Sequence, residues 1–293
     1  LVSALKKSSR CKGYLIIRDI FPEWAVDMGL MGRGLPYRFF DAVARYQYSV
    51  ADVIGVQTPG NQRYFDLWKE QPGRELEVLQ NWLDKPMQSQ CSIRVVETAL
   101  AGRKVFVYAG NMGVAQGMDI LLALAEKLRS RSDVGFLFVG RGSDADRLRF
   151  ESKIRQLENV LFFDEIHPDE IPDLYAQCSA GIVALDPGHK SHNIPGKFLT
   201  YMQSGLPVLA NINTGNDLAQ MIRGEDVGEV CETNDLGELA GLADRLLLRI
   251  EEGEEFSTRC RDFFEREFSV EKAFRQIVTA LSPKDAGIHK NIQ

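Results

Sequence analysis

The sequence predicts an α/β protein whose parallel sheets are covered by helices on both faces. The prediction rests on the second part of the chain, where short apolar segments alternate with segments of helical spacing. Apolar strands that are each followed by a helix are typical of parallel sheets buried on both faces. Because such connections are right-handed, the expected sheet is doubly wound. The chain has 293 residues, of which 44% are hydrophobic and 26% charged, so two domains are expected.

In the first part of the chain, the sequence predicts three strands and two helices. An apolar strand in 13–24 ends in an acidic turn that contains proline. Residues 86–103 lose periodicity, and we place a domain boundary there. Residues 1–19 resemble the end of a helix that leads into a strand, so the first domain is expected to be truncated at its N-terminus. The other expected elements are helices at 38–51 and 61–70 and strands at 52–59 and 75–84.

The second part predicts a regular succession of strands and helices. Proline near the start of the segment 168–178 is compatible with a helix, because its missing N–H is not needed in the first turn. A further helix is expected to begin beside Lys197, and the tail 234–282 is nearly all helical in pattern. The expected strands are 104–110, 134–140, 159–165, 180–185, 206–212 and 227–232, and the remaining helices are 117–130, 144–157 and 216–223.

Composition argues against several classes of protein. The net charge is -6, with 35 basic and 41 acidic residues, whereas a general nucleic-acid binder needs a basic surface. The five cysteines and four histidines have no spacing typical of a metal site, and reduced thiols in a cytosolic protein are expected. No apolar run reaches the ~18 residues that a membrane span requires.

The turns that follow the strands form the candidate site, because ligands of doubly wound sheets bind at the carboxyl ends of strands. These turns are rich in glycine, which lets the backbone approach a ligand. They also precede helix N-termini, where free N–H groups and the helix dipole favour anions. Lys197 lies in one of them, beside a helix start, so an anion-binding site is predicted. The turns are 109–117, 140–145, 164–170, 186–197 and 211–217.

One of these turns allows a different interpretation. The segment "GRGSDA", 140–145, fits the dinucleotide-binding pattern, with Asp164 and Glu165 about twenty residues further on. Alone it would indicate an NAD-binding enzyme. However, that pattern usually opens the first strand–helix–strand unit of a domain, and here it lies in the second.

A more specific pattern is P-x-K-x-x-x-Y-M-x-x-G-x-P-V, which runs from Pro195 to Val208. Together with "YAGNMGVAQG", "FLFVGRGSDADRL" and "DLYAQCSAGIVAL", it resembles the C-terminal domain of the family 4 retaining glycosyltransferases, which have the GT-B fold. "RDIFPEW" and "ADVIGVQTPGNQRYF" resemble the late part of that family's N-terminal domain, "EVLQNWLD" its interdomain crossing and "FSVEKAFRQIV" its final helix. The chain is most similar to the bacterial transferases that build O-antigen or capsule sugars.

The resemblance implies a GT-B-like fold with two Rossmann-like domains, the first truncated. Residues 1–88 would be part of the acceptor domain, 89–268 the nucleotide-sugar-binding domain, and 269–293 a helix that returns to the first. It implies a nucleotide-diphosphate sugar donor, UDP before GDP, and retention of anomeric configuration, with no cofactor and no required metal. The acceptor would be a glycan or a lipid-diphosphate-linked sugar. A cytoplasmic location is expected, with peripheral contact with the inner membrane left open.

The resemblance also points to particular residues. Leaving-group stabilisation is expected from Lys197 and Arg141, a contact with the donor sugar from His192, and an acidic group facing the cleft from Asp19. Arg141 could instead pair with Asp144 or Asp146 as an ordinary salt bridge. The donor-binding candidates are Gly110, Asn111, Gly113, Gln116, Gly140, Gly142, Ile166, Asn193, Pro195, Gly196 and Thr200.

The chain departs from the family pattern at several positions. Many members have two glutamates where this sequence has His192 and Thr200, and many have arginine and lysine where it has Asn111 and Gln116. Arg18 takes the place of the family's histidine in the first domain. These departures keep a second hypothesis open, a non-catalytic nucleotide-sugar-binding or scaffold protein. The sequence does not identify the sugar, the base, the acceptor or a catalytic base.

Overall fold

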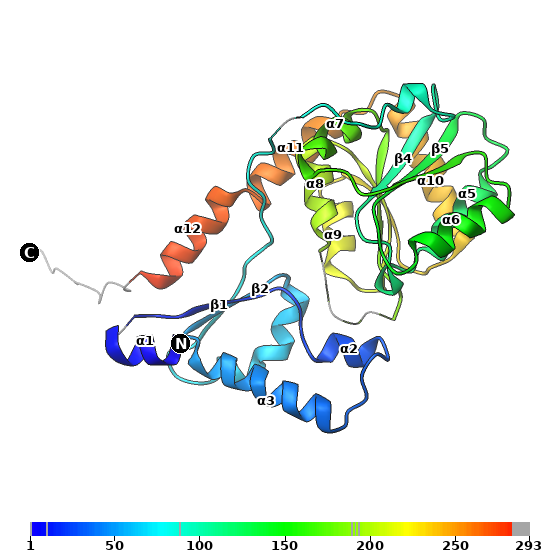
Figure 1. Ribbon diagram of the computed structural model, residues 1–293. Helices are drawn as coiled ribbons and strands as arrows, with labels where there is room; N and C mark the ends of the chain where they lie inside the picture. The colour runs from blue at the N-terminus through cyan, green and yellow to red at the C-terminus, as the bar shows by residue number, and fades with distance from the viewer. Residues whose placement is uncertain are drawn as a thin grey trace, which may run out of the picture.

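The computed structural model describes residues 2–9, 11–87, 89–188, 190, 192 and 194–282, which form two α/β units (Figure 1). Each unit contains a parallel sheet, so the predicted fold class is confirmed. The first unit carries a three-stranded sheet in the order β1-β2-β3. Its elements are α1 (Val2–Ser9), β1 (Tyr14–Ile17), α2 (Glu23–Asp27), α3 (Leu35–Val50), β2 (Val53–Val56), η1 (Pro59–Phe65), α4 (Asp66–Lys69) and β3 (Glu75–Val78).

The segment predicted as one helix at 61–70 is divided in the structure. A 3-10 helix, η1, precedes a single turn of α-helix, α4. Within η1, Gly60 and Asn61 form hydrogen bonds with residues of the second unit. The backbone here is arranged for that contact, and it does not form a continuous α-helix. The expectation of a regular helix was wrong for this reason.

The second unit has a six-stranded sheet in the order β6-β5-β4-β7-β8-β9, with every pair parallel. The order reverses between β4 and β7, which makes this the topological switch point where ligands of doubly wound sheets bind. The elements are η2 (Val95–Glu97), β4 (Lys104–Ala109), η3 (Val114–Gln116), α5 (Asp119–Lys127), β5 (Val134–Val139), α6 (Ala145–Ile154), β6 (Val160–Phe163), η4 (Pro168–Glu170), α7 (Ile171–Ala176), β7 (Ala180–Ala184), α8 (Gly196–Ser204), β8 (Val208–Asn211), α9 (Asp217–Gly224), β9 (Gly228–Cys231), α10 (Leu236–Glu251) and α11 (Phe256–Glu267).

The core of the second unit lies on both faces of its sheet. Successive side chains of β4 alternate between two apolar clusters: Val105 and Val107 join one, and Phe106 and Tyr108 the other. Helices α7, α8, α9 and α11 cover the first face, and α5, α6 and α10 the second (Figure 1). This burial on both faces explains why the strands are continuously apolar.

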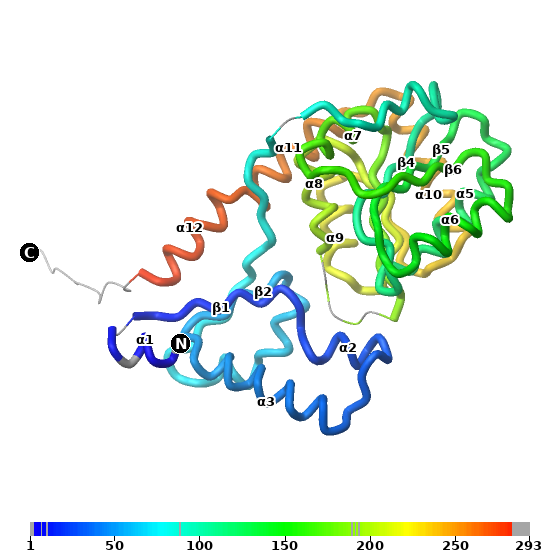
Figure 2. Tube along the Cα trace, in the orientation of Figure 1, coloured from blue at the N-terminus to red at the C-terminus, as the bar shows by residue number. Residues whose placement is uncertain are grey.

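The segments around Leu83 and Ser269 lie side by side where the chain crosses between the two units (Figure 2). The Leu83 N–H donates to the Phe268 carbonyl at 3.0 Å. After this crossing, α12 (Val270–Leu281) runs back along the first unit, where the Gln276 amide donates to the Val78 carbonyl at 2.7 Å. The predicted final helix therefore contacts the first sheet through Gln276; residues 283–293 lie outside the described part of the chain.

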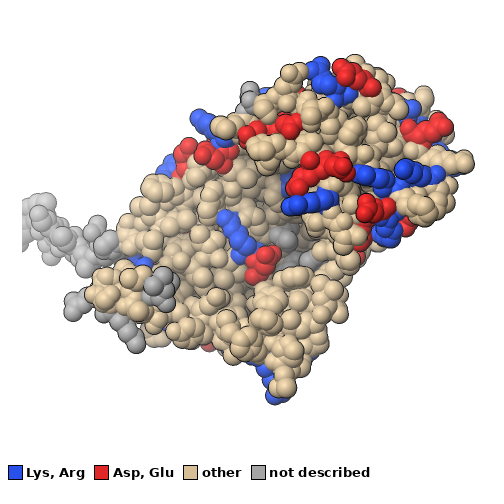
Figure 3. Space-filling model, viewed as in Figure 1, with Lys and Arg blue, Asp and Glu red and all other residues tan. Residues whose placement is uncertain are grey.

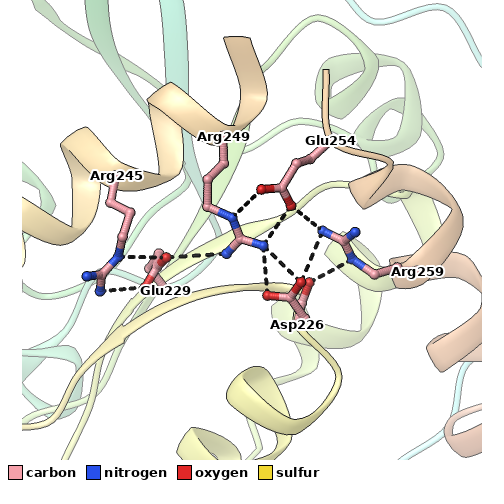
Figure 4. Close-up of polar contacts among 6 residues, drawn as sticks. All are labelled: Asp226, Glu229, Arg245, Arg249, Glu254 and Arg259. Atoms are coloured by element: carbon pink, nitrogen blue, oxygen red, sulfur yellow. Dashed lines mark hydrogen bonds and ion pairs between the residues drawn. The ribbon is translucent and has the colours of Figure 1, made fainter. Parts of the chain in front are cut away.

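An ion-pair network ties the last helices of the second unit to β9 (Figure 4). Arg249 is 18% exposed and binds Asp226, Glu229 and Glu254, at distances from 2.7 to 3.3 Å. Arg259 shares Glu254, at 2.9 Å. Because each of the three carboxylates has two arginine partners, this network joins α10, α11 and β9.

Charge is distributed unevenly on the face shown in Figure 3, where most charged side chains lie over the second unit. The basic residues Lys6 and Lys12, near the start of the chain, both bind within the molecule. Lys6 pairs with Asp52, and Lys12 donates to carbonyls near the end of α12. No helix in the described part of the chain is long and apolar enough to cross a membrane.

Candidate functional site

A cavity of about 290 Å³ lies at the switch point of the six-stranded sheet. It is lined by the ends of β4 and β5, by the segment that follows β6 and by the start of α8. Five residues that the sequence predicts as site residues line it, namely Gly110, Gly140, Ile166, Lys197 and Thr200. Four of the five turns predicted to form the anion site thus meet around one concavity, whereas the turn 211–217 does not line it.

Lys197 supplies the cation of this cavity. Its Nζ lies 3.4 Å from the centre of the Tyr108 ring. The same Nζ lies 3.6 Å from the position that a Cβ on Gly110 would occupy. None of the ion pairs among the described residues involves Lys197, and burial lowers its pKa to about 7. A partly buried ammonium that is held only by an aromatic face is well suited to a negatively charged ligand.

Gly140 and Gly142 allow the turn after β5 to lie directly against the turn after β4. A Cβ on Gly140 would lie 2.1 Å from the Gly110 carbonyl oxygen, and one on Gly142 would lie 2.2 Å from that of Met112. Both glycines also have positive φ, +141° and +152°. They are therefore required for the loops to approach each other, whatever ligand binds. Gly110 differs, because only the Lys197 side chain lies within 4 Å of its missing Cβ.

Asn111, Gly113 and Gln116 bind one another. The Gln116 Oε1 accepts from the Gly113 N–H at 3.0 Å and from the Asn111 amide at 3.2 Å. These contacts shape the turn between β4 and α5. Whether the same residues contact a donor stays a prediction.

Arg141 lies outside the lining of the cavity. It pairs at 3.0 Å with Glu165, which does line it, and not with Asp144 or Asp146 as the sequence suggested. The two side chains are 81% and 56% exposed. Because exposed ion pairs are weak, Arg141 could exchange this partner for an anion at the rim of the cavity.

Of the residues predicted at the start of α8, Lys197 and Thr200 line the cavity, whereas Pro195 and Gly196 do not. Pro195 is the N-cap, and Gly196 is the first residue of the helix. The Thr200 hydroxyl donates to the Lys197 carbonyl at 2.9 Å, one turn back along the helix. The proton of the Thr200 hydroxyl is thus engaged within its own helix. Asn193 lies outside the described residues.

His192 and Asp19 do not line the cavity. The His192 Nδ1 lies 2.9 Å from the Asp217 carboxylate, and its imidazole packs against Gly60 of the first unit. Asp19 is exposed after β1, whereas the neighbouring Arg18 places its guanidinium 4.3 Å from the centre of the Trp82 ring. His192 therefore takes part in the contact between units.

Two tyrosines at the site carry no signal in the sequence: Tyr175 lines the cavity, and Tyr108 is fully buried and contacts Lys197. Tyr108 is the penultimate residue of β4, and the face of its ring makes a cation–π contact with the ammonium of Lys197. Tyr175 lines the cavity from α7 and packs on Tyr201. Both lie in apolar segments whose pattern predicts core residues. The sequence therefore gives no indication that they belong to a site.

Comparison with known proteins identifies the family. Residues 103–249, half of the chain, match the sequence profile of the glycosyl transferases group 1. A probable glycosyltransferase of Pseudomonas aeruginosa, WbjE, is 26% identical over 247 residues, which are 80% of this chain and 60% of that protein. A putative colanic acid biosynthesis glycosyl transferase of Escherichia coli, WcaI, is 23% identical and is matched over 94% of this chain and 68% of its own length.

Solved structures agree on the fold. HepE of Anabaena, crystallised in complex with UDP, superposes with a TM-score of 0.73 at 16% identity, over 95% of this chain and 74% of that one. Sucrose-phosphate synthase from Thermosynechococcus elongatus superposes with a TM-score of 0.66 at 16% identity, over 91% and 68%. At this identity the likeness concerns the fold alone, and the family assignment rests on the matched profile. The chain belongs to the group 1 glycosyl transferases.

Proposed function

We propose that this chain contains the donor site of a retaining glycosyltransferase. The enzyme would transfer a sugar from a nucleoside-diphosphate donor, with UDP favoured over GDP, to a glycan or lipid-linked acceptor in surface polysaccharide biosynthesis. The observation that carries the proposal is the Lys197 ammonium, which faces the cavity at the switch point without an ion-pair partner among the described residues. A diphosphate is the part of the donor that such a cation binds.

The chemistry follows from the charge that develops on the leaving group. As the bond between the anomeric carbon and the phosphate oxygen breaks, negative charge accumulates on the departing diphosphate. Lys197 and the N–H groups of the turn after Gly110 would stabilise that charge, with no metal required. The acceptor oxygen would form its bond on the same face of the sugar, and its proton would pass to an oxygen of the leaving diphosphate.

The relatives support this choice of substrates. HepE has been crystallised with UDP and with UDP-glucose, and WcaI is named for colanic acid biosynthesis. We propose a nucleotide sugar as donor and a cytoplasmic location for the protein. A lipid-diphosphate-linked acceptor would bring it to the inner face of the membrane. Because the chain spans only part of the length of these relatives, its activity is tested most directly through the donor.

Titration calorimetry with UDP, GDP and NAD tests the proposal. We expect UDP to bind more tightly than the other two, and we expect Lys197→Ala to weaken UDP binding about 10- to 100-fold, because a hydrogen bond to a charged group contributes about 1.5–3 kcal/mol. Lys127→Ala, which removes an exposed lysine of α5, is the matched control and should bind UDP like the unmodified chain.

Three results would contradict the proposal or part of it. Binding of NAD without binding of any nucleoside diphosphate would favour the dinucleotide interpretation of 140–145. Unchanged UDP affinity in Lys197→Ala would remove the role assigned to that ammonium. Donor binding without transfer to lipid-linked acceptors would instead indicate the non-catalytic alternative.

A further inference from the structure

Two buried amide side chains of the first unit hold the segment that leads to Lys197. Gln57 and Asn61 follow β2, and each is 2% exposed. The Gln57 amide donates to the Ile194 carbonyl at 3.3 Å and accepts from the Ile194 N–H at 3.2 Å. The Asn61 amide binds His192 in the same two ways, at 2.6 and 3.0 Å. His192 and Ile194 are therefore each held through both the N–H and the carbonyl of their backbone.

The surrounding contacts keep these two amides in place. A Cβ on Gly60 would lie 2.1 Å from the His192 Nδ1, so the imidazole occupies the space beside that glycine. The Gly60 N–H donates to Asp217 at 2.7 Å, and the same carboxylate pairs with His192. On the other side, the Asn81 amide donates to the Ile194 carbonyl at 3.3 Å. Among the described residues, this contact between the units is polar and largely buried.

The segment runs directly into the helix that carries the proposed catalytic cation. Ile194 is fully buried in the core of the second unit, and Pro195 caps α8. Lys197 is the second residue of that helix, only three positions beyond Ile194. A displacement of the Ile194 backbone would therefore move the helix start and the ammonium with it. Displacements of about 1 Å at a reacting group can change rates about 100-fold.

We infer that Gln57 and Asn61 are positioning residues, through which the first unit sets the location of the Lys197 ammonium in the cavity of the second. Neither residue touches that cavity. A change in the position of Lys197 would be measured as a change in nucleoside-diphosphate affinity, so this part of the inference rests on the proposed function. It follows that the donor site is fully formed only while the two units are in contact.

The test combines hydrogen exchange with nucleotide binding in Asn61→Leu and Gln57→Met. Without nucleotide, amide exchange at His192 and Ile194 reports the contact itself, because each N–H is bound by one of the amides. The Phe198 N–H, which donates to the Pro195 carbonyl at 2.9 Å, reports the helix start. We expect exchange at all three amides to accelerate at least about tenfold in the variants.

With nucleotide, each variant should bind UDP about tenfold more weakly. On a Lys197→Met background the same substitutions should change UDP affinity less than about twofold, because their effect passes through Lys197. Asn159→Leu is the matched control: Asn159 is also 2% exposed, and its amide donates to the Ala125 carbonyl at 2.9 Å, away from the contact between units. This control should lower stability but leave UDP affinity and Phe198 exchange unchanged.

The possible results separate the inference from the proposed function. Unchanged exchange at Phe198 in both variants, or an equal loss of UDP affinity with and without Lys197, would overturn the positioning role. If the unmodified chain binds no nucleoside diphosphate, the proposed function fails, and the exchange at Phe198 alone decides whether Gln57 and Asn61 position the helix start.

Discussion

Replacing Lys197 with methionine is expected to stabilise the folded protein while weakening its binding of a diphosphate. Methionine keeps most of the length and apolar character of the side chain and removes its charge. The ammonium is partly buried against Tyr108, and burial lowers its pKa from the ordinary value of 10.5 to about 7. The charged form is therefore less favourable in the folded protein than in the unfolded chain.

The magnitude follows from the two pKa values. At about 1.4 kcal/mol per pH unit, a folded-state pKa of about 7 makes the charged lysine up to about 5 kcal/mol less favourable than in the unfolded chain. This penalty is fully present below pH 7. It decreases as the pH rises toward 10.5, because the unfolded chain then binds more protons than the folded protein. At pH 9 the remaining penalty is up to about 2 kcal/mol.

Urea denaturation at pH 6 and pH 9 measures this effect. We expect Lys197→Met to have a higher free energy of unfolding than the unmodified chain at both values, with the larger difference at pH 6. UDP binding should be about 10- to 100-fold weaker in the variant. A variant that is less stable than the unmodified chain, or a stability difference that does not change with pH, would refute the assignment of a desolvated ammonium.

Three further substitutions test other parts of the structure. Gly140→Ala should lower the free energy of unfolding by about 2–4 kcal/mol in urea denaturation, because its Cβ would lie 2.1 Å from the Gly110 oxygen; a near-neutral effect would contradict the close approach of the two loops. Thr200→Glu should raise UDP affinity about three- to tenfold in calorimetry, because a carboxylate accepts hydrogen bonds from ribose hydroxyls better than a threonine that already bonds to its own helix; weaker binding would argue against a ribose at this position. Arg249→Met should destabilise the protein by about 1–2 kcal/mol at pH 7. This last difference should shrink in acid denaturation, because Arg249 holds the pKa of Glu254 at about 2 in place of 4.5, and the stabilisation from that ionised carboxylate is lost as the pH falls between these values.

The sequence by itself determined the class of the fold and the edge of the sheet at which the site lies. Apolar segments that alternate with helical segments are typical of parallel strands buried on both faces. In such a sheet the glycine-rich turns that follow the strands lie at one edge. That argument brought Gly110, Gly140 and Lys197 to the same place, and the structure agrees. Local pattern was sufficient because these residues lie within two positions of a strand end or a helix start.

The contacts of individual side chains were decided by tertiary structure. Asn111 and Gln116 bind each other within one turn, and Arg141 pairs with Glu165 of a neighbouring turn, and no local pattern encodes either pairing. His192 packs between Gly60 and Asp217, which lie 132 positions before it and 25 positions after it in the chain. The same holds for Gln57 and Asn61, which look like ordinary turn residues in the sequence. Their role depends on how the two sheets face each other, and that arrangement follows from packing across the whole molecule.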